Sequence, residues 1–402
     1  MINVDIANIW GQVSLGDMLE LESRLFSAHS KLAQDTEKGK NLTSWMQLPE
    51  KKLSELILLS ERICLDSDVL VVIGDSGATL GAQAVIELLQ GPHRNLGLGR
   101  SNPQILFAGD NLSTLDYNQL TRLLAGRSFS LLVIAGTTLS REAAIALRSL
   151  RWRLDRKSGT DYGRDRIFVV TDPKEGPLRQ LVEAEGWENY ELPTGTDPLC
   201  ALLSPAGLLP MAVAGIDVKA LLKGAREAVD AFNLLSFDNP AWLYTTARHL
   251  LHASGQQQEF LGSFEPGFCA MGRWWQQLFS RTGPVPFPIR LPGEQALPEQ
   301  LQRQHPRSFF ETLIRFDGPD RELIINRNVF DPEGLNALAD QSLDQVQKAC
   351  FDALVEEHAD LDIPLVSVEC GQLSEQTLGQ LIWFFLLSRA LSQGLQTEAR
   401  SD

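Results

Sequence analysis

The sequence lacks the features that would place the chain in a membrane or in an oxidising compartment. No stretch approaches the roughly 20 apolar residues that a membrane helix needs. The five cysteines are widely spaced and include no CxxC pair, so neither a zinc site nor a disulfide framework is indicated. The N-terminus, "MINVDIANIWGQVSLGD", has no basic region followed by an apolar run, so it does not read as a signal peptide. We therefore predict a cytoplasmic protein with no metal, no cofactor and no membrane partner.

Basic residues are also scarce. The chain carries 36 basic and 51 acidic side chains, a net charge of −15, which repels nucleic acid and anionic lipid in general. A small anionic ligand held in one local site is still compatible with this charge. The 402 residues, 44% of them hydrophobic, are enough for a substantial core and about two domains of roughly 150–200 residues each.

Apolar strands alternate with helices from residue 68 onward, after a helical start that includes "DMLELESRLFSAHSKLAQD". The first series of predicted strands is "DVLVVIG", "PQILFAG", "FSLLVIAG", "RIFVVTD" and a short "NYELP". Continuous apolar strands separated by helices predict βαβ units and a mostly parallel sheet covered on both faces. Ligands bind at the carboxyl ends of the strands in such sheets.

A helical stretch and a second alternating region follow. The second region includes the strands "QQEFLGSF", "FFETLIRFD" and "PLVSVEC" and a long helix over 335–358, while "RTGPVPFPIRLPGEQALPEQ" predicts an irregular loop. The predicted organisation is a helical N-terminal segment (1–45), a first α/β domain (46–205) and a second α/β domain (206–402).

Nine strings in order resemble glucose-6-phosphate isomerase of the shorter bacterial type. They are "SWMQLPE", "DSDVLVVIG…LGAQAVIELL", "NPQILFAGDNLS", "FSLLVI…EAAIALR", "SPAGLLPMAVAGIDVKALLKGA", "NPAWLYTTARHLL", "FEPGFCAMGRWWQQLF", "FFETLIRF" and "LSEQTLGQLIWFF". The resemblance covers nearly the whole chain. It implies two sugar-isomerase (SIS) domains, each an αβα sandwich with a mostly parallel sheet, and a cytoplasmic dimer whose active site lies between domains and subunits.

The resemblance places a phosphate cradle after the third strand. The family pattern Ser-Lys-Thr/Ser-x-Thr-Thr-x-Glu aligns with "AGTTLSRE", residues 135–142. Gly136 then stands at the lysine position, while Thr137, Thr138 and Ser140 keep hydroxyls at or near the others. A strand–turn–helix with hydroxyls and free N–H groups can hold an anion, but Thr138 or Ser140 can equally cap the helix alone. Both interpretations stay open on the sequence.

The opening loop "GDSGATLG" is the second wall of the predicted sugar site. The family resembles Gly-Ile-Gly-Gly-Ser-x-Leu-Gly here, and Gly77, Ala78 and Thr79 are our binding candidates in this loop. Asp75 departs from this family pattern. Its carboxylate repels a bound phosphate if it points inward, or it faces solvent or accepts N–H bonds from its own turn.

The positions that the resemblance makes catalytic are changed. Leu199 takes the place of the signature arginine that stabilises the enediolate, and Arg281 takes the place of the glutamate base. Arginine cannot be a general base near neutral pH, because its pKa is roughly 12.5 or more. Ala296 stands at the ring-opening histidine position, and we interpret nearby His305 as a surface residue. The chain ends before the family's C-terminal lysine motif would begin.

Other histidines carry weaker signals. His249 and His252 lie three residues apart on one predicted helix, but no third metal ligand is evident, so a partly buried helix face is favoured. His358 is predicted to serve a capping or dipole role at a helix end.

Three hypotheses follow. The first is a catalytically impaired or inactive isomerase homologue that binds a sugar phosphate or a protein partner, as a homodimer or as a heterodimer with an active isomerase. The second is an active isomerase of glucose 6-phosphate and fructose 6-phosphate with a rebuilt site. The third is a different reaction on the same fold.

Overall fold

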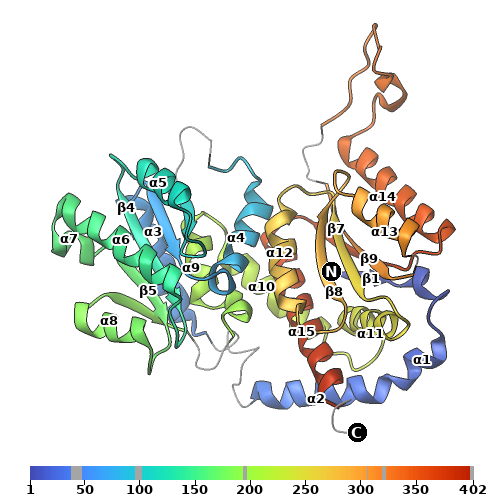
Figure 1. Ribbon diagram of the computed structural model, residues 1–402, viewed down its shortest axis with the longest axis horizontal. Helices are drawn as coiled ribbons and strands as arrows, with labels where there is room; N and C mark the ends of the chain where they lie inside the picture. Colours follow the sequence, from blue (N-terminus) through green and yellow to red (C-terminus); the bar gives the residue numbers. More distant parts are fainter. Residues whose placement is uncertain (38–47, 96–101, 193–196, 306, 319–322, 399–402) are drawn as a thin grey trace. The chain divides into compact units, whose positions relative to one another are not determined.

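The computed structural model describes residues 1–37, 48–95, 102–192, 197–305, 307–318 and 323–398 (Figure 1). The chain forms two compact units. Unit 1 comprises Met1–Lys31 and Ala220–Asp402, and unit 2 comprises Leu32–Lys219. The first residues of the chain therefore belong to the same unit as its second half.

Unit 2 is built on a five-stranded parallel sheet, which confirms the prediction of a parallel α/β fold. All five strands of the first predicted series are present, in the order β3-β2-β4-β5-β6. Their bounds are β2 Val69–Ile73, β3 Gln104–Ala108, β4 Phe129–Ala135, β5 Ile167–Thr171 and β6 Glu188–Glu191. The strand β2 is wholly buried, as its unbroken run of β-branched and leucine residues predicts.

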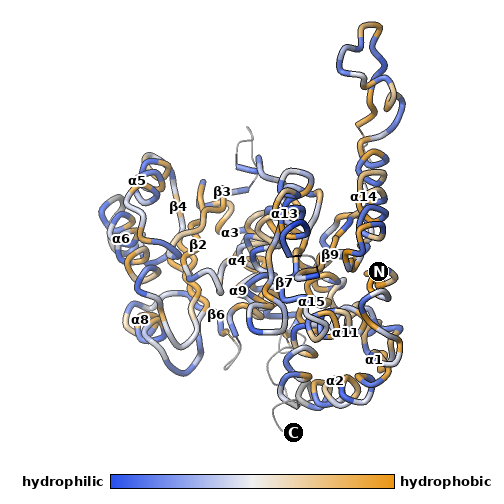
Figure 2. The backbone as a smooth tube through the Cα atoms, turned by 45° about the vertical axis from the view of Figure 1, so that its right-hand side comes forward, coloured by the Kyte–Doolittle hydropathy of each residue, from blue (hydrophilic) through white to orange (hydrophobic). Residues whose placement is uncertain are grey.

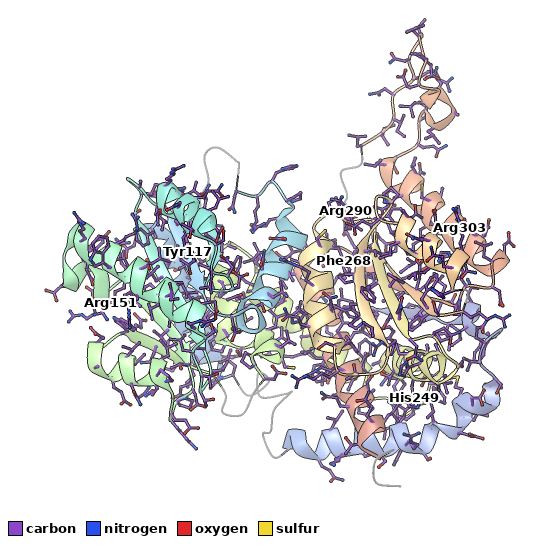
Figure 3. The ribbon with its side chains drawn as sticks, in the orientation of Figure 1. Tyr117, Arg151, His249, Phe268, Arg290 and Arg303 are labelled. Atoms are coloured by element: carbon purple, nitrogen blue, oxygen red, sulfur yellow. The ribbon has the colours of Figure 1, made fainter. Side chains whose placement is uncertain are left out.

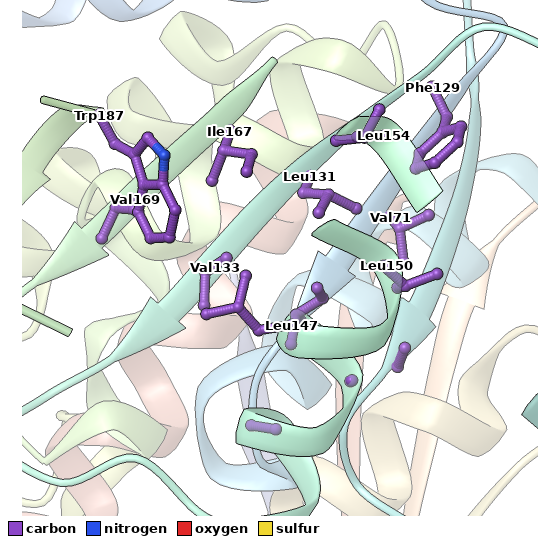
Figure 4. Packing of buried hydrophobic residues seen from close by; sticks show 14 of the residues in the cluster. Val71, Phe129, Leu131, Val133, Leu147, Leu150, Leu154, Ile167, Val169 and Trp187 are labelled. Carbon is purple, nitrogen blue, oxygen red and sulfur yellow. The ribbon is translucent and has the colours of Figure 1, made fainter. Parts of the chain in front are cut away.

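The helices of unit 2 cover this sheet. They are α3 Glu50–Asp66, α4 Ser76–Gln90, α5 Thr114–Leu123, α6 Arg141–Ser158, α7 Thr160–Arg164, α8 Pro177–Glu185 and α9 Pro205–Val213, with a 3₁₀ turn η3 at Pro198–Leu203. Figure 4 shows one apolar layer, in which side chains of α6 such as Leu147 and Leu150 pack on Leu131 and Val133 of β4.

Unit 1 contains a mixed sheet with the order β1-β10-β9-β7-β8. Its strands are β1 Asn3–Asp5, β7 Gln258–Ser263, β8 Val285–Arg290, β9 Phe309–Asp317 and β10 Leu365–Gln372. All neighbours are parallel except β1, which pairs antiparallel with β10. The three-residue strand β1 was not predicted, because so short a segment carries no periodic signal.

The prediction of an irregular loop over 281–300 is wrong. Residues 285–290 form β8, and Ala296–Gln304 form helix α13. The prolines at 286 and 288 suggested a loop, but β8 lies at the edge of the sheet, where a residue without an N–H donor is tolerated.

The remaining helices of unit 1 are α1 Leu15–Glu20, α2 Glu22–Glu37, α10 Val218–Ala231, α11 Pro240–Ala253, α12 Phe268–Phe279, α14 Leu343–Asp360 and α15 Glu375–Glu398, with 3₁₀ turns η1 Ala7–Ile9 and η4 Leu335–Leu338. The predicted long helix over 335–358 is interrupted between η4 and α14. Asp340 there has a φ of 69°, which a helix does not accommodate. Ser342 then caps α14 through a capping box with Gln345.

Residues 323–342, which precede α14, form an arm that extends away from the rest of unit 1 (Figures 1 and 2). The side chains of Val329 and Phe330 on this arm are exposed, Phe330 at 79% of its surface. Exposed apolar side chains on a projecting segment are typical of a protein contact surface.

The predicted domain ranges, 1–45, 46–205 and 206–402, stay a prediction, because proximity in the native state does not establish which segments fold on their own. Within the described residues, no helix is both long and apolar enough to span a lipid bilayer.

Candidate functional site

The candidate loops of unit 2 meet at the point where the strand order reverses. Strand β2 lies between β3 and β4, with Ile73 paired to Ala108 on one side and to Val133 on the other. The chain therefore leaves β2 toward one edge of the sheet and returns to build the other edge from β4. The crevice outside the carboxyl ends at such a switch point is the usual ligand site of a parallel sheet. The loops after β2 and β4 are the two predicted site loops.

In the loop after β2, the acidic residue Asp75 is hydrogen-bonded to the loop itself. Asp75 is the N-cap of α4, and its Oδ1 accepts a hydrogen bond from the Ala78 N–H at 3.0 Å. The hydroxyl of Thr79, a buried residue, donates to the Asp75 carbonyl at 3.1 Å. Of the two alternatives for Asp75, the structure therefore has the carboxylate bonded to its own turn. The Ala78 N–H and the Thr79 hydroxyl are both engaged within the loop.

A close backbone approach holds this loop against β4. A Cβ on Gly74 would lie 2.9 Å from the carbonyl oxygen of Ile134, so a larger residue would push the two strand ends apart. Gly77 lies between the cap residue Asp75 and Ala78, and it is half-buried. Gly74 thus has a packing role whether or not a ligand binds.

The loop after β4 leaves its hydroxyls more accessible. Ser140 caps α6, because its Oγ accepts from the Ala143 N–H at 3.2 Å, so the capping interpretation holds for this residue. Thr137 and Thr138 are exposed, and Gly136 is half-buried with its carbonyl accepting from the Thr171 hydroxyl at 3.3 Å. The candidate residues of the two loops lie at the carboxyl ends of the neighbouring strands β2 and β4. Asp75 is the acidic residue of the first loop.

The changed catalytic positions lie in both units. Leu199 belongs to η3 of unit 2 and is 9% exposed, so it is an apolar packing residue. In unit 1, Arg281 is exposed just beyond the end of α12, and Ala296 is the exposed first residue of α13. His305, at the end of α13, is exposed as expected for a surface residue. The side chains of Leu199, Arg281 and Ala296 offer no general base near neutral pH.

A buried polar network in unit 1 was missed by the sequence analysis. Arg248 of α11 and Glu259 of β7 are 1% and 0% exposed, and Arg248 Nε donates to Glu259 Oε2 at 2.5 Å. The other oxygen, Oε1, accepts from the hydroxyls of Tyr244 and Thr312, both at 2.8 Å. Burial and the adjacent Glu259 carboxylate raise the pKa of the Tyr244 phenol well above its ordinary value, so the phenol stays a donor. The sequence does carry a signal for this network, because Arg248 and Glu259 are each a single charged residue inside an apolar segment.

The surroundings of His249 and His358 point to structural roles for these histidines. No group of three or more histidine, cysteine, aspartate or glutamate side chains among the described residues could hold a metal ion. His249 lies on α11 (Figure 3), and burial, together with Arg24 and His252, lowers its pKa. His358 is buried, and its Nε2 lies 3.3 Å from Glu311 Oε1 while its Nδ1 lies 2.8 Å from the Leu354 carbonyl oxygen.

His358 is expected to make the stability of the protein depend on pH. Burial disfavours its charged form, but the nearby Glu311 carboxylate, together with the Leu354 carbonyl, outweighs burial and raises its pKa above the ordinary value of 6.5. A raised folded-state pKa gives stability that is fully present below about pH 6.5 and is lost as the pH rises through the folded value. His358→Leu should lower the free energy of unfolding by about 1–3 kcal/mol at pH 6 and by less at pH 9.

The measurement is urea unfolding at both pH values, with the exposed His305→Leu as the control. His305→Leu, at an exposed position, should change the free energy of unfolding by less than about 0.5 kcal/mol at either pH. A loss for His358→Leu that grows as the pH rises would contradict the assignment.

This architecture is that of an α/β protein, and the two candidate loops of unit 2 lie at the switch point of its parallel sheet. Comparisons with known proteins agree with this fold. The chain is 33% identical to glucose-6-phosphate isomerase of Staphylococcus aureus over 377 residues, 91% of this chain and 84% of that protein. It is 34% identical to glucose-6-phosphate isomerase of Listeria monocytogenes over 385 residues, 92% of this chain and 86% of that protein. No model of a protein family matches the chain.

Solved structures show the same fold. A hypothetical protein from Thermus thermophilus matches with a TM-score of 0.86 at 23% identity, over 98% of this chain and 94% of that chain. A glucose-6-phosphate isomerase from Chlamydia trachomatis matches with a TM-score of 0.70 at 15% identity, over 88% of this chain and 69% of that chain. With the identity to the curated relatives, these comparisons establish that the chain belongs to the glucose-6-phosphate isomerase family.

Proposed function

We propose that this chain is a family member that binds a sugar phosphate but does not isomerise it at a substantial rate. The observation that carries the proposal is the set of residues at the four chemical positions. Gly136, Leu199, Arg281 and Ala296 stand where the resemblance implies a lysine, an arginine, a glutamate base and a histidine. Proton transfer between two sugar carbons requires a base and a stabilised enediolate, and these residues supply neither.

Sugar-phosphate binding is supported by the loop after β4. The exposed hydroxyls of Thr137 and Thr138 lie at the start of α6, whose N-terminus favours an anion. Asp75 opposes this binding, because its negatively charged carboxylate lies in the neighbouring loop, at the same carboxyl end of the strands. We therefore expect a weak site.

We further propose that the chain acts in the cytoplasm as a homodimer, or as a heterodimer with an intact isomerase. The arm formed by residues 323–342 supports a protein contact, because its apolar side chains, Val329 and Phe330 among them, are exposed. The alternative function, an active isomerase with a rebuilt site, is favoured by the identity to two isomerases.

Replacing Asp75 by Asn should strengthen sugar-phosphate binding. Asparagine is as good an N-cap as aspartate, so α4 should keep its cap while the repulsive charge disappears. Removing one exposed like charge from the neighbouring loop is worth up to about 1 kcal/mol, which corresponds to roughly fivefold in affinity. Isothermal titration calorimetry with fructose 6-phosphate measures the change.

The matched control is Asp161→Asn, which removes an exposed carboxylate from α7 of the same unit. Asp161→Asn should leave the affinity unchanged, and unphosphorylated fructose should bind neither variant. Weaker binding by the Asp75→Asn variant would mean that the carboxylate contacts the sugar hydroxyls favourably. That result would overturn the proposed placement of the phosphate.

A further inference from the structure

Helix α6 has a basic outer face, although the net charge of the chain is −15. Its inner side chains, Leu147 and Leu150 among them, pack on β4 (Figure 4). The exposed side chains recur every three or four residues, which places them in one stripe along the helix. They are Ile145, Arg148, Ser149, Trp152, Arg153 and Arg156. From residue 145 to residue 156 the helix rises by about 17 Å.

The arginines of this stripe carry charges that the chain does not balance locally. Among the described residues, the ion pairs of α6 are made by Arg141 and Arg151, and Arg151 pairs with both Asp155 and Glu185. None of these ion pairs involves the three arginines of the stripe. The segments 117–129 and 143–154 contain five arginines and no aspartate or glutamate. Such a local excess of positive charge attracts an anionic partner.

A pocket of about 420 Å³ opens beside the stripe. The turn at 124–126 and Phe129 line it from the segment that leads into β4, and Trp152, Arg153 and Arg156 line it from α6. Trp152 is 57% exposed, and its ring centroid lies 5.0 Å from the guanidinium carbon of Arg156. The volume lies within the roughly 300–1,000 Å³ of small-ligand pockets, so one large side chain of a partner fits.

The residue types favour a protein segment as the partner. Tryptophan and arginine are the residues most enriched among the few that dominate the energy of protein interfaces. An extended segment rises about 3.3 Å per residue, so about five residues span the stripe. A nucleic acid or an anionic membrane presents negative charge over a much larger area, which the acidic surface of the whole chain repels. A short acidic segment interacts mainly with the nearest charges, because salt screens those beyond about 10 Å.

We propose that the outer face of α6 binds a short acidic segment of another protein, with an aromatic side chain of that segment in the pocket beside Trp152. The surface is separate from the proposed sugar-phosphate site. The pocket includes Phe129, the first residue of β4, whereas the candidate loop follows Ala135, the last residue of the same strand. The two sites therefore lie at opposite ends of β4, and neither depends on the other.

The test uses the full chain and a fluorescein-labelled peptide of sequence Asp-Glu-Phe-Glu-Asp, followed by fluorescence anisotropy. We expect saturable binding that weakens as the salt concentration rises, because salt screens exposed charges. A peptide with lysine in place of each acidic residue should not bind. A peptide with alanine in place of phenylalanine should bind at least about fivefold more weakly, since no side chain then fills the pocket.

Variants of the chain show whether the peptide binds at this surface. The double variant Arg153→Gln, Arg156→Gln should bind the acidic peptide at least about fivefold more weakly, and Trp152→Ala about tenfold more weakly. The matched control, Arg226→Gln with Arg303→Gln, removes the same charge from exposed positions of unit 1 and should weaken binding by less than about twofold. The affinity for fructose 6-phosphate should be the same in all of these variants, so failure at one site is distinguishable from failure at the other.

Three outcomes would overturn the proposal. The first is no saturation by the acidic peptide up to about 1 mM. The second is an equal loss of affinity in the control variant, which would mean that the peptide responds only to net charge. The third is binding of phosphatidylserine vesicles or of a single-stranded oligonucleotide, but not of the peptide, which would assign the stripe to a membrane or to a nucleic acid.

Discussion

Replacing Glu259 by Gln is expected to lower the free energy of unfolding by about 3–5 kcal/mol. The carboxylate is 0% exposed and is the charged partner of Arg248, which is itself 1% exposed. Without it, the guanidinium keeps its charge in a site that water does not reach, because arginine does not lose its proton at accessible pH. The variant also weakens the bonds that Oε1 accepts from Tyr244 and Thr312.

Urea unfolding followed by tryptophan fluorescence measures this loss, since Trp242, Trp274 and Trp275 are buried in unit 1. The double variant Arg248→Met, Glu259→Leu is the matched control. It removes both charges and keeps much of the apolar volume, so it should be more stable than Glu259→Gln alone. A change below about 1 kcal/mol in Glu259→Gln would mean that water or a rearranged side chain compensates Arg248.

The sequence predicted the central sheet of unit 2 well because burial there follows directly from composition. An uninterrupted run such as "VLVVI" must be covered on both faces, and the helices on either side of it supply that cover. The sequence failed where position within the sheet overrides local preference. Proline at 286 and 288 argues against a strand, but the edge position of β8 removes the need for a partner on one side.

The two candidate loops could be placed in the fold from the sequence, while their role as a binding site stays a prediction. Strand–loop–helix patterns placed both loops at carboxyl strand ends, and the family resemblance identified them. Whether Asp75 faced a ligand or capped α4 depended on the dihedral angles of one turn, which the residue types do not determine. The pairing of Arg248 with Glu259 was also inaccessible, because it depends on how α11 packs against β7.

Isomerase turnover is expected to be at least about 10⁴-fold below that of an intact relative. A positioned general base contributes roughly 10²–10⁴-fold, and a donor aimed at the developing oxyanion contributes roughly 10²–10³-fold. Arg281 cannot accept the proton, and the buried Leu199 has no side-chain donor for the enediolate. The two losses together predict a reduction of about 10⁴–10⁷-fold.

The most direct measurement is the conversion of fructose 6-phosphate to glucose 6-phosphate, detected by a coupled dehydrogenase at high protein concentration. The protein is prepared from a host that lacks its own isomerase, because a trace of that enzyme would mimic weak activity. The Listeria monocytogenes relative, assayed in parallel, sets the reference rate. We predict a rate at least about 10⁴-fold below that reference. A rate within about 100-fold of the reference that falls sharply in Thr137→Ala would contradict the account and reveal a rebuilt active site.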